Sequence, residues 1–110
     1  MTRRNWYGEG IAHYQVALAL FQAGEPHQDE LRAANLCALE AMRVRGVRSV
    51  EIHRHDDACE ACRAVPSEVL DIADAMAQAP LPVQGCTHVR DERPSFCRCE
   101  YVPHEEPQRP

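Results

Sequence analysis

The sequence predicts a small α+β domain, in which an N-terminal helical hairpin (residues 9–46) packs on a cysteine-rich module (residues 47–102). Apolar residues recur every three or four positions over two segments of the first half, which is the spacing of a helix face. Five of the six cysteines follow residue 58, where this period has given way to short alternating stretches. The 110 residues suffice for one such domain, with a flexible arm at residues 1–8 and a disordered, Pro- and Glu-rich tail at residues 103–110.

The two predicted helices are separated by Gly24 and Pro26, which stop the first helix and leave a short loop. The first helix is expected over residues 9–23, with four apolar residues on one face: Ile11, Tyr14, Leu18 and Phe21. The second is expected from about Gln28 to Gly46, with an apolar stripe of Leu31, Ala34, Ala38 and Met42. A short loop between two helices predicts an antiparallel pair.

The second half predicts short strands and one further helix. Residues 47–52 alternate and are rich in β-branched side chains, which indicates a strand. Ser67 is expected to cap a third helix that ends at Pro80. The apolar face of that helix would consist of Val69, Ile72, Ala73 and Met76. Residues 97–102 alternate again and predict a final strand.

The cysteines predict a metal site. Cys59 and Cys62 form a CxxC pair, and two thiolates at this spacing on a turn can hold one Zn²⁺ ion. The other ligands would come from the last third of the chain. The candidates for a four-coordinate site are Cys59, Cys62, Cys86, His88, Cys97 and Cys99, with iron as an alternative to zinc. The competing interpretations are reduced thiols packed as small apolar groups, disulfides and redox chemistry. Cys37 lies in the second predicted helix and is expected to be a packing residue.

Residues 33–103 resemble the C-terminal part of the phage Mu F-like minor head proteins, the head-morphogenesis family. The matching pieces, in order, are Ala38-Leu39-Glu40-Ala41, Gly46-Val47, Val50-Glu51-Ile52, Asp56 to Cys62, Pro80-Leu81-Pro82 and Cys97-Arg98-Cys99. The chain departs from the family at Arg93-Pro94, where the family has His-Pro, and it lacks the family's long N-terminal part. The resemblance implies a structural role in assembly near the capsid portal, with a phage or mobile-element assembly component as partner.

Charge and hydropathy restrict the partners. The net charge is -5, and the second half of the chain is the acidic one, which disfavours nonspecific binding to nucleic acid. A single basic patch is open to such contact: Arg43, Arg45, Arg48 and Arg54. No apolar run approaches the roughly 20 residues that cross a bilayer, so no membrane partner is expected. Because no secretory signal is recognisable, a cytoplasmic or virion-associated protein is expected.

These observations predict a small zinc-stabilised structural and interaction protein rather than an enzyme. The first alternative is a thiol redox protein that uses Cys59 and Cys62, although the acidic neighbours Asp57 and Glu60 would disfavour thiolate formation. The second alternative is a zinc-ribbon-like module that binds nucleic acid through the arginine patch.

Overall fold

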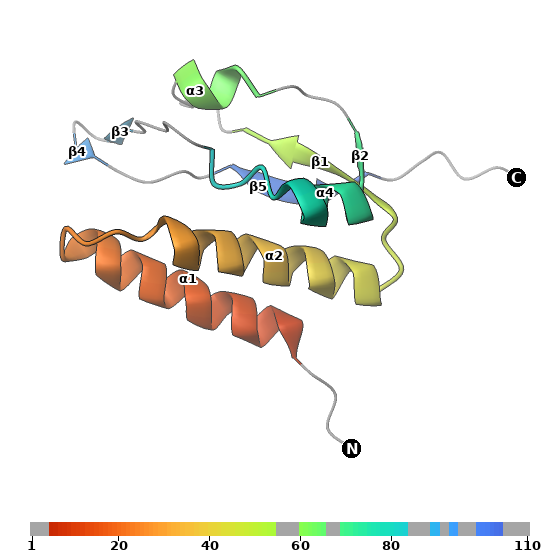
Figure 1. Ribbon diagram of the computed structural model, residues 1–110, viewed down its shortest axis with the longest axis horizontal. Helices are drawn as coiled ribbons and strands as arrows, with labels where there is room; N and C mark the ends of the chain where they lie inside the picture. The colour runs from red at the N-terminus through yellow and green to blue at the C-terminus, as the bar shows by residue number, and fades with distance from the viewer. Residues whose placement is uncertain are drawn as a thin grey trace, which may run out of the picture.

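The predicted α+β class is confirmed. A computed structural model describes residues 5–54, 60–65, 69–83, 89–90, 93–94 and 99–104, with the backbone alone for residues 89–90 and 93–94. The elements in chain order are α1 (Trp6–Gln22), α2 (Gln28–Val44), β1 (Ser49–His53), α3 (Glu60–Arg63), β2 (Leu70–Asp71), α4 (Ile72–Gln78), β3 (Val89–Arg90), β4 (Arg93–Pro94) and β5 (Glu100–Pro103). Figure 1 shows α1 as the outermost layer, α2 in the middle and the sheet with α4 on the other side of α2.

The helical pair forms as its sequence predicts, although α1 begins at Trp6, three residues before the expected start. The side chain of Asn5 causes this earlier start, because its Oδ1 accepts a hydrogen bond from the backbone N–H of Gly8 at 3.0 Å and caps the helix. His13 then joins the two helices, since its Nδ1 lies 2.5 Å from Oε2 of Glu30 on α2.

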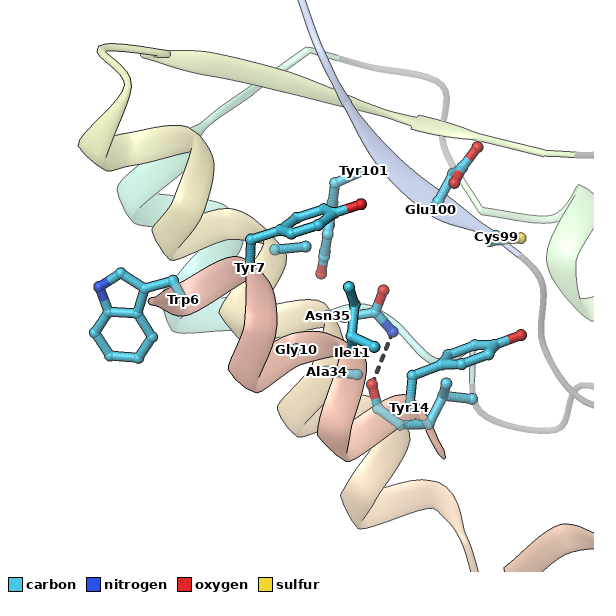
Figure 2. A pocket seen from close by; sticks show the side chains of 12 residues that line it. Trp6, Tyr7, Gly10, Ile11, Tyr14, Ala34, Asn35, Cys99, Glu100 and Tyr101 are labelled. Atoms are coloured by element: carbon cyan, nitrogen blue, oxygen red, sulfur yellow. Dashed lines mark hydrogen bonds between the residues drawn. The ribbon is translucent and has the colours of Figure 1, made fainter. Parts of the chain in front are cut away.

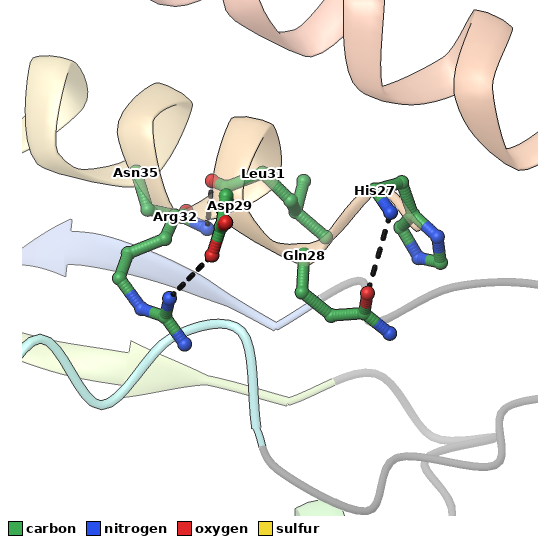
Figure 3. Close-up of polar contacts among 6 residues, drawn as sticks. All are labelled: His27, Gln28, Asp29, Leu31, Arg32 and Asn35. Carbon is green, nitrogen blue, oxygen red and sulfur yellow. Dashed lines mark hydrogen bonds and ion pairs between the residues drawn. The ribbon is translucent and has the colours of Figure 1, made fainter. Parts of the chain in front are cut away.

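Helix α2 begins at Gln28, as expected, and polar contacts in its first turns stabilise it (Figure 3). Arg32 forms an ion pair with Asp29 at 3.3 Å, three residues earlier on the same helix. The side-chain amide of Asn35 donates to the backbone oxygen of Leu31 at 3.0 Å, so this side chain is held against its own helix. Asp29 also places a negative charge at the N-terminal end of the helix dipole, where it is favourable.

Helix α2 is buried on two sides, which the single predicted stripe did not capture. The stripe correctly includes Leu31 and Ala34, which are buried, but Cys37 and Leu39 are buried as well. The reason is the layer order, because α2 contacts α1 on one side and α4 with β5 on the other. The expectation that Cys37 packs in the interior is confirmed.

The main sheet has the strand order β2-β1-β5, and both pairings are antiparallel. Strand β1 lies in the centre, with Ile52 opposite Tyr101 of β5 and Val50 opposite Leu70 of β2. Val50 and Ile52 point into the core, as the alternating pattern of residues 47–52 predicts. Strands β3 and β4 form a separate two-stranded antiparallel pair.

The prediction that the third helix begins at Ser67 is wrong. Leu70 and Asp71 form strand β2 instead, and α4 begins at Ile72. Asp71 determines this start, because its side chain accepts a hydrogen bond from the backbone N–H of Ala73 at 3.1 Å. Ser67 itself lies outside the described residues. The helix ends before Pro80, as expected.

Apolar side chains from both long helices, β1, α3, α4 and β5 form the core, and the largest fully buried ones are Leu39, Val50, Cys62 and Leu81. Tyr101 connects two parts of it, since its hydroxyl oxygen accepts a hydrogen bond from the backbone N–H of Leu81 at 3.3 Å. This contact fixes β5 against the segment that follows α4.

A candidate docking groove beside the helical pair

The prediction of a structural zinc ion is wrong for the part of the chain that the structure describes. Those residues contain no group of three or more His, Cys, Asp or Glu side chains that could hold a metal ion. Cys62 lies in α3 and Cys99 directly precedes β5, and both side chains belong to the apolar core, at 2% and 7% exposed. Both cysteines are thus part of the buried core. The remaining predicted ligands lie outside the described residues: Cys59, Cys86, His88 and Cys97.

Two of the four arginines in the predicted basic patch, Arg43 and Arg54, form contacts with other residues of the chain. Nη2 of Arg43 lies 2.7 Å from Oε2 of Glu40, and this hydrogen bond, reinforced by the attraction between the charges, raises the pKa of the Arg43 guanidinium above its ordinary value. Nη1 of Arg54 donates to the backbone oxygens of Arg63 and Val65, at 2.6 and 3.1 Å. Arg54 therefore stabilises the segment after α3. Arg45 and Arg48 lie between α2 and β1.

A groove of about 500 Å³ lies where α1, α2 and β5 meet. Helix α2 forms its floor, and α1 and the first residues of β5 form its two walls. Figure 2 shows Tyr7 and Tyr14 leaving α1 in the same direction, whereas Trp6 at the start of the helix points the other way. The volume is within the usual range of protein binding sites, which is roughly 300 to 1,000 Å³. The residues that line it include Tyr7, Ile11 and Tyr14 of α1, Leu31 and Ala34 of α2, and Glu100 of β5.

The wall that α1 contributes is apolar and exposed. Tyr7, Ile11 and Tyr14 are 70%, 43% and 45% exposed. Their spacing of four and three residues places them on one face, which includes two members of the face predicted from the sequence. This face is only partly packed, because the side of α1 that contacts α2 is centred on the buried Ala17. A contiguous exposed apolar surface of this kind is typical of interaction sites.

The helix that carries this face has very little charge. Between Trp6 and Gln22 it contains no Lys or Arg, and Glu9 is its single acidic residue. A solvent-facing helix normally has a charged outer face. The composition of α1 therefore resembles that of a helix covered on more than one side.

Two polar side chains of the groove are already engaged within the fold. Asn35 donates to the oxygen of Leu31, and the hydroxyl of Tyr101 accepts from the N–H of Leu81. Glu100 is exposed, and it is the one Asp, Glu, Lys or Arg among the lining residues, all of which the structure describes. The groove therefore combines the aromatic wall of α1 with one acidic residue at its edge, and Figure 2 shows the carboxylate of that residue directed away from the tyrosine rings.

Sequence reasoning concentrated on the cysteines and did not identify this groove. The available signal was the lack of charge in residues 6–22 together with three apolar residues on one face. That pattern predicts a buried helix face. Because α1 is the outermost layer of the fold, part of this face is exposed to solvent instead.

Comparison with known proteins gives no family: no protein-family model, no curated protein and no solved structure matches the chain. The resemblance to the phage head proteins therefore stays a prediction. Among the helices in the described ranges, none is both long and apolar enough to cross a membrane.

Proposed function

We propose that this chain is a small protein-interaction module that holds a segment of a partner protein in the groove between α1, α2 and β5. The observation that carries the proposal is the exposed face of Tyr7, Ile11 and Tyr14 on a helix with a single acidic residue and no Lys or Arg. Aromatic residues are enriched at the centres of protein interfaces, where charged residues are depleted. An interaction module needs only such a surface on a stable scaffold.

The exposed face of α1 can contribute a substantial part of the free energy of docking. Tyr7 and Tyr14 together expose about 200 Å² of side chain, since a tyrosine can bury about 150 to 250 Å². At about 25 cal/mol per Å², covering them contributes about 5 kcal/mol before the entropic cost of association. A few aromatic residues commonly supply most of the free energy of an interface.

The resemblance to head-morphogenesis proteins supports an assembly role and suggests the kind of partner, a component of a phage or mobile-element assembly. The alternatives receive less support from the described residues. A redox pair would include Cys62, whose side chain is only 2% exposed. A nucleic-acid site would use Arg43, Arg45, Arg48 and Arg54, and two of these four are already engaged, Arg43 with Glu40 and Arg54 with two backbone carbonyls.

Selection from a display library of random 12-residue peptides tests the proposal. We expect peptides that bind the unaltered chain to lose binding to the double variant Tyr7→Ser and Tyr14→Ser, because these rings form the exposed wall of the groove. Both residues are exposed, so the variant should keep its fold, which circular dichroism can check.

Val44→Ser is the matched control, since Val44 is 60% exposed and lies at the end of α2 outside the groove. Selected peptides should bind this variant as well as they bind the unaltered chain. Enrichment of peptides that bind all three proteins equally would contradict the proposal, as would the absence of any enrichment.

A further inference from the structure

We propose that the segment held in the groove is α1 of a second copy of this chain, so that two copies associate through their α1 helices. The inference rests on the proposed docking function and names the partner of that site. Three observations carry it: the spacing of the apolar residues on α1, the absence of charge at the exposed positions of this helix, and the area that the contact would cover.

The apolar residues of α1 beside the groove have the spacing with which two helices pack along each other. Tyr7, Ile11 and Tyr14 follow one another at four and three residues, and Leu18 continues the series after four more. An alternation of three and four keeps the side chains on one stripe that faces a partner helix. These four residues form the α1 seam, which is about 16 Å long. The occupant that matches this stripe is a helix with the same spacing, and a second copy of the chain supplies one.

The α1 seam lies next to the side of α1 that packs on α2. Ala17 is buried on that side, and Gly10 lies close to Cys37 of α2. Figure 2 shows Tyr7 and Tyr14 leaving the helix together in one direction. In a dimer, each α1 would therefore be covered by its own α2 on one side and by the second α1 on the neighbouring side. This double cover accounts for a helix with so little charge in the outermost layer of the fold.

Charge restricts the surface through which two copies can meet. The net charge of the chain is -5, so two copies repel each other unless they approach through an uncharged surface. All of α1 is described, and none of its exposed residues is Asp, Glu, Lys or Arg. Glu9 is half-buried and lies about 200° around the helix from Tyr7, away from the seam. Figure 2 shows the carboxylate of Glu100 directed away from the tyrosine rings as well, so two seams meet without like charges between them.

The contact area is that of a weak, reversible dimer. Tyr7, Ile11 and Tyr14 are 70%, 43% and 45% exposed, which corresponds to about 300 Å² of surface in each copy. Gln15 and Gln22 are exposed beside the seam and enlarge the contact. Because the same residues are covered in both copies, the total reaches about 900 Å², which is in the range of transient protein interfaces. We therefore expect a dissociation constant of about 10 to 100 μM.

Sedimentation velocity of the full chain under reducing conditions tests the inference. Reducing conditions are needed because the chain has six cysteines, which could otherwise link copies by disulfides. The average mass should rise from that of one copy toward that of two between about 2 and 300 μM protein, with the midpoint set by the expected dissociation constant.

Two variants on α1 locate the contact. Ile11→Glu places two carboxylates in the middle of a symmetric seam and should weaken association at least about tenfold. Val16→Glu is the matched control, because Val16 is 46% exposed, close to the 43% of Ile11, and lies about 140° away around the same helix. This control should associate as the unaltered chain does. Circular dichroism checks that both variants keep their helices.

Isotope-filtered nuclear Overhauser effects in a mixture of labelled and unlabelled chains give a direct readout. We expect transfer from the Ile11 methyl groups of one copy to tyrosine rings of the other. Association that persists in Ile11→Glu, or that both variants weaken equally, would overturn the inference by moving the contact to another surface. A mass that stays at one copy up to about 300 μM would overturn it too. Loss of library peptides in the double tyrosine variant would then assign the groove to a different protein and leave the docking function standing.

Discussion

Gly10 determines how closely the two long helices approach each other. A Cβ atom at this position would lie 3.1 Å from the Cβ of Cys37 and 3.4 Å from the backbone oxygen of Ala34. A glycine inside a helix costs about 1 kcal/mol relative to alanine, so the position is explained by packing rather than by helix propensity. Because α1 and α2 approach closely at Gly10, the residues of α1 that line the groove lie directly beside those of α2.

The variant Gly10→Leu should lower the free energy of unfolding by about 1 to 3 kcal/mol, because a large side chain must push α1 away from α2. Ala19→Leu on the same helix is the control, since Ala19 is exposed and its replacement should change stability by less than about 0.5 kcal/mol. Urea unfolding followed by circular dichroism measures both. An increase in stability for Gly10→Leu would show that the helices are not in close contact there.

Tyr101 connects the sheet to the segment after α4 through its hydroxyl group. Replacement by phenylalanine leaves the buried N–H of Leu81 without this acceptor, which should cost about 1 to 2 kcal/mol in urea unfolding. The control is Tyr7→Phe, which removes a hydroxyl from a side chain that is 70% exposed and should leave stability within about 0.5 kcal/mol. Equal effects of the two changes would exclude a stabilising role for the Tyr101 hydroxyl.

Among the helices and strands, the sequence pattern correctly predicted those elements that depend on interactions between residues close together in the chain. The three- and four-residue period gave both long helices, and alternation gave β1. The start of α4 could not be read in this way, because Ser67 and Asp71 are both good caps and the choice depends on the pairing of Leu70 with Val50. The second buried side of α2 was also hidden, since it depends on the layer order of the whole molecule.

The side chain of Asp71 caps the N-terminus of α4. Asp71→Ala removes the acceptor for the N–H of Ala73 and should destabilise the protein by about 1 kcal/mol. Asp71→Asn keeps a capping oxygen and should retain most of that stability. Thermal unfolding followed by circular dichroism distinguishes the two. If the two variants lose the same stability, the side chain of Asp71 does not cap α4.

At the scale of the whole molecule, the layer order creates the candidate site. Because α2 alone separates α1 from the sheet, the flank of α1 and the start of β5 face each other across α2 and leave a groove. The cysteine pattern led sequence reasoning to a metal centre instead, yet Cys62 and Cys99 are core residues. The spacing of residues along the chain shows which side chains could form a site together. Whether Tyr7 and Tyr14 are exposed depends instead on how elements distant in the sequence pack against α1.

The most direct measurement is a chemical-shift map of the isotopically labelled chain with a peptide from the display selection. We expect the largest changes at Tyr7, Ile11, Tyr14 and Glu100, with Val44 and Val69 unaffected, because the latter two are exposed apolar residues outside the groove. Changes centred on Val44, Val69 or the arginines between α2 and β1, with the groove residues unmoved, would contradict it.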